Sequence, residues 1–92
     1  MHDQKTWSRL FRGLANLSRL KIIALLSKER ELAVSDIAQR IHVSIRGTSK
    51  HLIQLAGLGI LDRDGKAGHV FYSLNKSSMN SATRSIIDKF LS

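Results

Sequence analysis

The chain has 92 residues, which predicts one small domain that gains stability from a partner subunit. Its net charge of +8 suits binding to an acidic polymer or an anionic surface. It contains no cysteine, which excludes disulfides, zinc–thiolate sites and thiol redox switches. Its longest apolar run, Ile22 to Leu26, is far shorter than the roughly 20 residues that a bilayer needs, and no segment resembles a signal peptide, so we expect a cytoplasmic protein with no membrane partner.

Apolar residues at helical spacing predict two helices in the first third of the chain. The first carries a stripe at i, i+3, i+4 and i+7, formed by Trp7, Leu10, Phe11 and Leu14. We expect Gly13 to help to end this helix and Asn16 to cap the next. The second helix shows a stripe made of Leu17, Leu20, Ile23 and Ala24.

Two further helices follow, joined by a very short connection. We expect Ser35 to cap the third helix, which turns Ile37, Ala38 and Ile41 inward. Ser44 caps the fourth, which runs through Leu52 and Leu55 to a breaker at Gly59. The connection Ile41-His42-Val43 is long enough only for a tight corner. This outline predicts a helix-turn-helix over about residues 35–58.

Two β-prone runs and a last helix complete the chain. The runs Ile60–Arg63 and His69–Leu74 flank the turn Asp64–Gly68 and predict a hairpin, so that residues 60–74 would form a wing. Residues 77–91 carry a wide apolar stripe, made of Met79, Ala82, Ile86, Ile87, Phe90 and Leu91. This helix would bind a second subunit or simply pack on the first helix.

Four segments together resemble the ArsR/SmtB family of winged-helix transcriptional repressors. They read LANLSRLKIIALL, ELAVSDIAQRI, VSIRGTSKHLIQLAGLGIL and GHVFYSLN. Five residues in them match the family pattern in type and order: Asn16, Arg19, Ser49, His51 and Gly59. The resemblance implies one mainly α winged helix-turn-helix domain over residues 1–92, with four helices, two strands and a last helix. It also implies a homodimer held by the terminal helices, with interface candidates Trp7, Leu10, Phe11, Met79, Ile86, Ile87 and Phe90.

The fourth helix has a polar, cationic face suited to double-stranded DNA. At 100° per residue, Ile45, Arg46, Ser49, Lys50 and Ile53 share one face, opposite Thr48, Leu52 and Leu55. We predict a base contact for Arg46 and leave Lys50 open between base and phosphate. The recognition-helix candidates are Ser44, Ile45, Arg46, Thr48, Ser49, Lys50 and His51. The wing candidates, for the DNA backbone or minor groove or as solvated charges, are Arg63, Lys66 and His69.

The metal sites of the resembled family have no counterpart in this sequence. Where many members place a Cys-Val-Cys-like segment, this chain has Ala33-Val34-Ser35, which offers no soft ligand. The segment Lys76–Ser92 contains one carboxylate, Asp88, and no histidine. The histidines fall in different elements and lack the close pairing of a zinc site: His2, His42, His51 and His69. We therefore expect no metal and no cofactor, a structural hydrogen bond for His51, and a positive φ at the His42 corner.

These patterns predict a homodimeric, sequence-specific DNA-binding transcriptional regulator without metal sensing, associated with the nucleoid through DNA. Repression is implied by the family resemblance alone. Paired carboxylates, a Ser/His/Asp spacing and a Gly-rich phosphate loop are all missing, so we expect no enzymatic activity. Two alternatives stay open, namely a winged-helix module for protein–protein assembly, and a protein that binds RNA or other nucleic acid without sequence preference.

Overall fold

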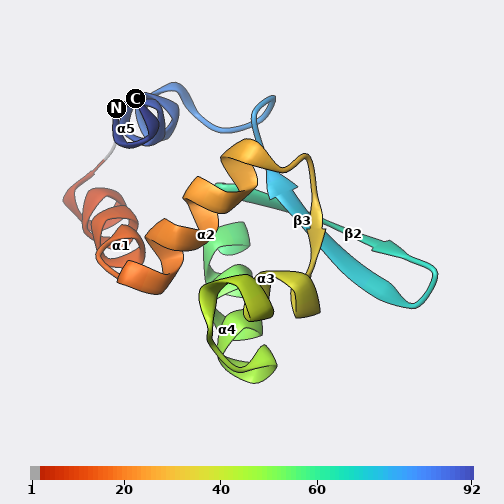
Figure 1. The fold of residues 1–92 in the computed structure, drawn as a ribbon. Coiled ribbons are helices and arrows are strands. Elements are labelled where there is room, and N and C mark those ends of the chain that lie inside the picture. Colours follow the sequence, from red (N-terminus) through yellow and green to blue (C-terminus); the bar gives the residue numbers. More distant parts are fainter. Residues whose placement is uncertain (1–2) are drawn as a thin grey trace.

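The computed structural model describes residues 3–92, which form a winged helix-turn-helix with five helices and a three-stranded sheet (Figure 1). The elements follow in the order α1 (Gln4–Leu14), α2 (Leu17–Lys28), β1 (Leu32–Ala33), α3 (Val34–Ile41), α4 (Ile45–Gly57), β2 (Leu61–Lys66), β3 (His69–Leu74) and α5 (Ser81–Leu91). The predicted fold class is confirmed, and no helix in the described part of the chain is long and apolar enough to span a membrane.

The strand β1 was not predicted from the sequence. It is two residues long and pairs antiparallel with β3, with Leu32 opposite Tyr72 and Ala33 opposite Phe71, to give the sheet order β1-β3-β2. A two-residue strand carries no alternation that a pattern could reveal. It ties the segment before α3 to the wing, and thereby fixes the helix-turn-helix against the sheet.

Polar side chains cap four helices, and one predicted cap is wrong. Asn16 Oδ1 accepts a hydrogen bond from the Arg19 amide at 3.1 Å, and Asn80 Oδ1 accepts one from the Thr83 amide at 2.8 Å. The predicted cap Ser35 lies inside α3, whose N-cap is Ala33 without a side-chain hydrogen bond. The chain passes directly from β1 into α3, so the sheet determines where that helix begins.

The core is formed mainly by α2, α3, α4 and the hairpin, with α2 in the centre (Figure 1), and α1 and α5 each add one buried residue, Leu10 and Ile87. On α2 the adjacent residues Ile22 and Ile23 are both fully buried, whereas Leu17 is 68% exposed. The predicted stripe through Leu17 was therefore wrong. A helix that contacts α1, α3, α4 and β3 on different sides buries more than one stripe, so a single-face pattern does not describe it.

The hairpin turn is tighter than the sequence suggested. Lys66 pairs with His69, and the two turn residues Ala67 and Gly68 have φ of 50° and 80°, as in two-residue turns that match the twist of the strands. Gly65, expected in the turn, pairs with Val70 inside the ladder. The ladder is consequently longer than the predicted runs of four and six residues would allow, because both strands have six residues.

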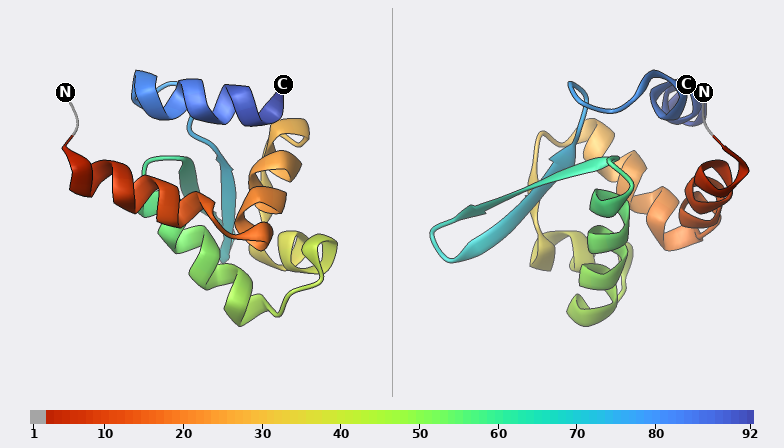
Figure 2. Two further views of the ribbon diagram at one scale, coloured as in Figure 1. Left: turned by 90° about the vertical axis from the view of Figure 1, so that its left-hand side faces the viewer. Right: turned by 180° about the vertical axis from the view of Figure 1, so that it is seen from behind.

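The terminal helices and the helix-turn-helix lie at opposite ends of the molecule. Figure 2 shows α5 above α1 at one end and α4 at the other, while the β2–β3 hairpin projects sideways. Gly13 lies inside α1, where it is buried and packs against the Leu58 side chain at the end of α4. Its role is therefore this close contact between helices, and the expectation that it ends α1 was wrong.

Candidate nucleic-acid interface

The turn before α4 is closed by its own side chains. Ser44 Oγ accepts a hydrogen bond from the Gly47 amide at 3.0 Å, which confirms Ser44 as the N-cap. His42 adopts φ 59° and ψ 44°, the left-handed conformation predicted for this corner. A Cβ on Gly47 would lie 3.1 Å from both Ser44 Oγ and Val43 Cγ1. The glycine thus provides room for the turn itself.

The outward face of α4 is cationic and open to solvent. Arg46 and Lys50 are exposed, and neither forms an ion pair in the part of the chain that the structure describes. Ile45 and Ile53 on the same face are each 59% exposed, while Ser49 is partly buried. No carboxylate occurs between Asp36 and Asp62. The face combines hydrogen-bond donors with apolar side chains that remain largely exposed.

The opposite face of α4 belongs to the core, and it includes one predicted DNA-contact residue. Thr48 is fully buried together with Leu52 and Leu55, so its side chain has no surface to offer to DNA and the prediction of a contact was wrong. The Thr48 hydroxyl has no hydrogen-bond partner among residues 3–92. A buried, unpaired hydroxyl opposes folding.

His51 links α4 to α2 and α1, as its predicted structural role required. Its Nδ1 accepts a hydrogen bond from Arg19 Nε at 3.1 Å, and the same guanidinium donates to the carbonyl oxygens of Gly13 at 3.1 Å and Arg12 at 3.4 Å. Desolvation and the neighbouring Arg19 charge lower the pKa of His51. The sequence did not reveal Arg19 as the centre of this link, because its three partners lie in other elements.

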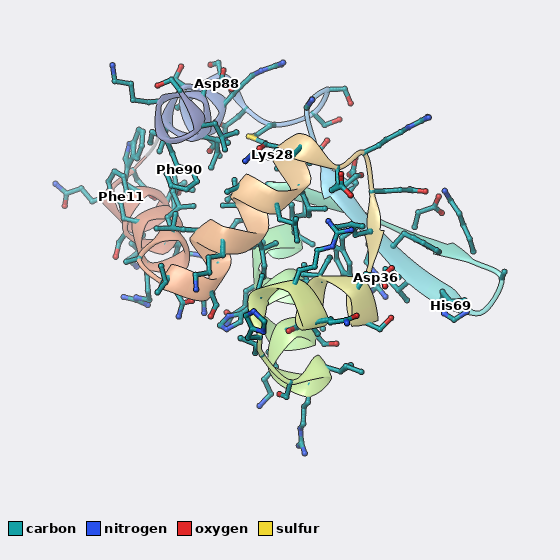
Figure 3. The ribbon with its side chains drawn as sticks, in the orientation of Figure 1. Phe11, Lys28, Asp36, His69, Asp88 and Phe90 are labelled. Atoms are coloured by element: carbon teal, nitrogen blue, oxygen red, sulfur yellow. The ribbon has the colours of Figure 1, made fainter. Side chains whose placement is uncertain are left out.

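The three wing candidates lie on two faces of the hairpin. Cross-strand partners share a face, so Arg63, opposite Tyr72, is on the body side, whereas Lys66 and His69 are together on the other side. Figure 3 shows His69 near the tip of the hairpin. The ring centroids of His69 and Phe71 are 6.5 Å apart in an edge-on arrangement. The wing therefore cannot present all three side chains to one surface.

Lys66 is held by carboxylates, which the sequence did not indicate. Its Nζ lies 2.6 Å from Glu31 Oε1 and 3.7 Å from Asp64 Oδ2, and 5.5 Å from the centre of the Phe71 ring. The hydrogen bond to Glu31 raises the pKa of Lys66. A DNA contact by Lys66 would have to compete with these carboxylates. Glu31 reaches the wing because β1 joins the sheet beside β3.

The terminal helices expose aromatic residues on one side, near Phe11 and Phe90 in Figure 3. Phe11 is 53% and Phe90 is 42% exposed, and the Trp7 and Phe11 rings stack with centroids 5.5 Å apart. Two of the seven predicted interface residues, Leu10 and Ile87, are buried in the core of the single chain and leave little surface for a partner. The other five keep exposed area: Trp7, Phe11, Met79, Ile86 and Phe90.

The described residues contain no cluster of three or more His, Cys, Asp or Glu side chains that could hold a metal ion. His42, His51 and His69 lie in the corner before α4, in α4 and in β3, respectively. His2, the fourth histidine, is outside the described residues.

Similar proteins are transcriptional regulators. The cadmium resistance transcriptional regulatory protein CadC of Listeria innocua is 42% identical over 71 residues, 75% of this chain and 60% of that protein. The transcriptional activator HlyU of Vibrio cholerae is 31% identical over 70 residues, 76% of this chain and 64% of the relative. The chain thus spans about 60% of the length of the curated relatives it matches. These relatives are regulators and not enzymes, in agreement with the expected lack of catalytic function.

Solved structures of such regulators share the fold. The structure of HlyU from Vibrio cholerae matches with a TM-score of 0.76 at 27% identity, covering 97% of this chain and 92% of that one. The homodimeric winged helix-turn-helix domain Mb0332 of Mycobacterium bovis, a possible ArsR-family regulator, matches with a TM-score of 0.75 at 22% identity, covering 97% and 82%. In addition, a family model described as the O-methyltransferase dimerisation domain matches residues 8–83.

Proposed function

We propose, from the premise that this chain belongs to the ArsR family of winged helix-turn-helix transcriptional regulators, that it represses transcription as a homodimer bound to operator DNA. The observation that carries this proposal is the exposed cationic face at the start of α4, where Arg46 and Lys50 have no acidic partner among the described residues. This face is the part of the fold that a helix-turn-helix inserts into the major groove.

Each outward residue of α4 has a chemical role in the proposed complex. Arg46 donates two hydrogen bonds to guanine O6 and N7, the commonest base-specific contact, and Ile45 packs on a thymine methyl group. Lys50, one turn later, reaches a base or a phosphate. Ser44 and Ser49 bind phosphate near the helix N-terminus, whose free N–H groups attract anions. His51 fixes the position of α4 through Arg19.

The wing adds a smaller, sequence-independent contribution. Arg63 and His69 are exposed on opposite faces of the hairpin. The face with Arg63 would contact the DNA backbone, while the face with Lys66 and His69 points to solvent. Asp62 and Asp64 reduce the attraction of this region for phosphate. The wing therefore assists binding and leaves the choice of sequence to α4.

The proposed dimer forms through the exposed aromatic side of α1 and α5. Phe11 and Phe90 would bury area that the monomer leaves in water, together with Trp7, Met79 and Ile86. The match to a dimerisation-domain model and the homodimeric state of the Mycobacterium bovis domain support this arrangement. Each α4 would then face one half-site of an inverted repeat.

Selection from a random pool of duplexes at moderate salt tests sequence-specific binding. We expect an inverted repeat whose half-sites are centred roughly 10 or 20 base pairs apart, one or two helical turns. Sedimentation of the same protein at micromolar concentration should show a dimer. Equal affinity for every duplex would leave only non-specific binding. A protein that is monomeric both when free and when bound to DNA would contradict the paired half-sites.

The direction of regulation needs a separate test. In a purified transcription reaction with the selected operator overlapping the promoter, we expect added protein to reduce the transcript, because a bound dimer and RNA polymerase would compete for the same duplex. A scrambled operator of equal length is the control. An increase in transcript would instead place the chain with regulators such as HlyU, which is named a transcriptional activator.

A further inference from the structure

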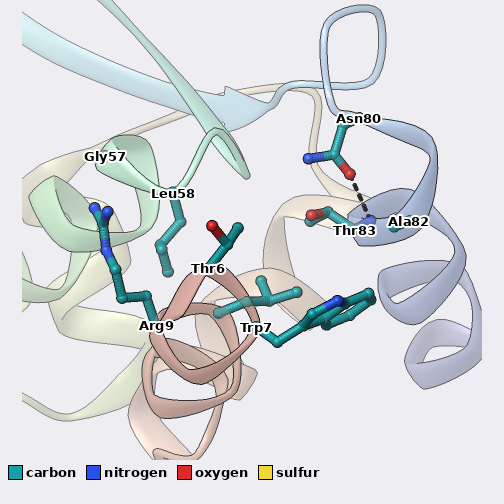
Figure 4. Close-up of a pocket in the computed structure, with 9 residues that line it drawn as sticks. Thr6, Trp7, Arg9, Gly57, Leu58, Asn80, Ala82 and Thr83 are labelled. Atoms are coloured by element: carbon teal, nitrogen blue, oxygen red, sulfur yellow. Dashed lines mark hydrogen bonds between the residues drawn. The ribbon is translucent and has the colours of Figure 1, made fainter. Parts of the chain in front are cut away.

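A cavity of about 160 Å³ opens between the start of α1, the start of α5 and the end of α4 (Figure 4). Its wall includes Thr6, Trp7, Arg9, Leu58, Asn80 and Thr83. We propose that this cavity binds a small aromatic acid, which acts as an effector of DNA binding. An apolar cavity of about 150 Å³ accommodates one benzene-sized ring, so the volume suits a single ring with one substituent.

One side of the cavity suits a planar ring. Figure 4 shows the Trp7 side chain lying beneath the first turn of α5, with Leu58 on the side of α4. Leu10 closes the floor as part of the core. An indole and two leucine side chains offer the flat, apolar contact that aromatic rings prefer.

The other side of the cavity suits a negative charge. Thr83 is only 5% exposed, its hydroxyl points into the cavity in Figure 4, and it has no hydrogen-bond partner among the described residues. Arg9 forms no ion pair within residues 3–92, and no carboxylate lines the cavity. The first turn of α5, with Asn80 as its cap, adds free N–H groups and a positive dipole end. The Thr83 hydroxyl and the first-turn amides of α5 on one side of the cavity, and the positive charge of Arg9 on the α4 side, together favour a carboxylate.

The position of the cavity connects the proposed dimer helices to the recognition helix. Leu58 is the C-cap residue of α4 and packs against Gly13 of α1, while Thr83 belongs to α5. This step rests on the proposed function. A ligand that prefers the spacing of these helices in the free protein lowers affinity for DNA, and DNA lowers affinity for the ligand by the same factor.

A titration of the full chain with sodium benzoate, followed by ¹H–¹⁵N correlation spectra, tests the site. We expect saturable shifts of the Thr6, Gly57 and Thr83 amides with a Kd of about 1 mM, as befits so small a ligand. Benzyl alcohol and benzamidine, of similar size but neutral or cationic, should bind about 10-fold more weakly because they lack the carboxylate.

Matched variants separate the site from general attraction to a basic protein. Thr83→Val and Arg9→Gln should each weaken benzoate binding by about 3- to 10-fold, whereas Lys5→Gln, an exposed cation on the same helix outside the cavity, should leave it unchanged. Equal loss in Arg9→Gln and Lys5→Gln, or no saturable shift at the three amides, would overturn the site.

A DNA arm tests the effector role. With the selected operator, benzoate should change the affinity of the wild-type protein and not that of Thr83→Val. Binding in the cavity without any change in operator affinity would overturn the effector role. If no operator can be selected at all, the proposed function fails, and the spectra still decide by themselves whether the cavity binds the acid.

Discussion

The recognition helix α4 and the wing present similar numbers of cations in very different settings. On α4, Arg46 and Lys50 are exposed with no carboxylate in the helix, whereas in the wing Arg63 and Lys66 stand beside Asp62 and Asp64. Lys66 is further held by Glu31 at 2.6 Å. The wing residues 61–74 therefore carry two cations and two carboxylates, and their formal charges cancel. A count of basic residues would rank the two regions together, although both cations of α4 are free of ion pairs among the described residues, whereas one of the two in the wing is held by carboxylates.

Replacing Arg46 with alanine should have the largest effect of the changes we expect. A bidentate contact to guanine contributes about 1–3 kcal/mol, so operator affinity should fall by roughly 5- to 150-fold in a titration followed by fluorescence anisotropy. Affinity for an unrelated duplex should fall less. Equal losses on both duplexes would show that Arg46 contacts phosphate, and would remove the main difference between α4 and the wing.

Replacing Thr48 with valine should stabilise the fold by about 1 kcal/mol, because valine has the same shape and removes an unpaired buried hydroxyl. Urea unfolding should show a higher midpoint with an unchanged slope. Operator affinity should not change, since this side of α4 belongs to the core. The control is Ser49→Ala, on the outer half of the helix, for which affinity rather than stability should move.

Replacing Lys66 with alanine should change operator affinity by less than about 2-fold, because Glu31 and Asp64 already engage this ammonium group. The matched variant is Arg63→Ala, which removes another exposed cation of the same strand. It should weaken binding to all duplexes by a few-fold, because a phosphate contact is lost. A larger loss in Lys66→Ala than in Arg63→Ala would reverse our assignment of the wing faces.

The link between His51 and Arg19 should appear as a small dependence of stability on pH. The folded state lowers the pKa of His51 below the 6.5 of the unfolded chain, so the unfolded state gains a proton first as the pH falls. The stabilising contribution is complete above about pH 6.5 and is lost as the pH falls through the folded pKa. Urea midpoints between pH 7.5 and 5 should therefore decline.

His51→Gln should flatten that decline, because the titrating ring is gone while a side chain able to accept from Arg19 remains. His69→Gln in the wing, where no such hydrogen bond to an arginine occurs among the described residues, is the matched control and should keep the wild-type slope. A slope unchanged in His51→Gln would show that another group carries the dependence.

Local chemistry made much of the fold predictable. Asn16 and Ser44 were expected as caps because their short polar side chains satisfy free amides, and both hydrogen bonds are present. His42 was expected at positive φ, and the helix-turn-helix and hairpin followed from spacing alone. For the outward face of α4, 100° periodicity placed Arg46 and Lys50 outside and Thr48 inside, although Thr48 was still counted among the DNA contacts.

Errors arose where a residue's surroundings come from distant parts of the chain. Leu17 is exposed and Ser35 is not a cap, because α2 is enclosed on several sides and β1 leads directly into α3. Leu10 and Ile87 resemble interface residues in the sequence, yet the packing of α1 and α5 on the body buries them.

The sequence by itself determined the local elements, because caps, turns and apolar periodicity act over a few residues. Only the tertiary structure decided which cations remain available. Arg19 is engaged by His51 and by two carbonyl groups of α1, Lys66 by Glu31 from β1, and Arg46 by nothing among the described residues. These partners lie up to 35 positions apart in the chain, so their contacts follow from how the helices and sheet pack rather than from any local pattern.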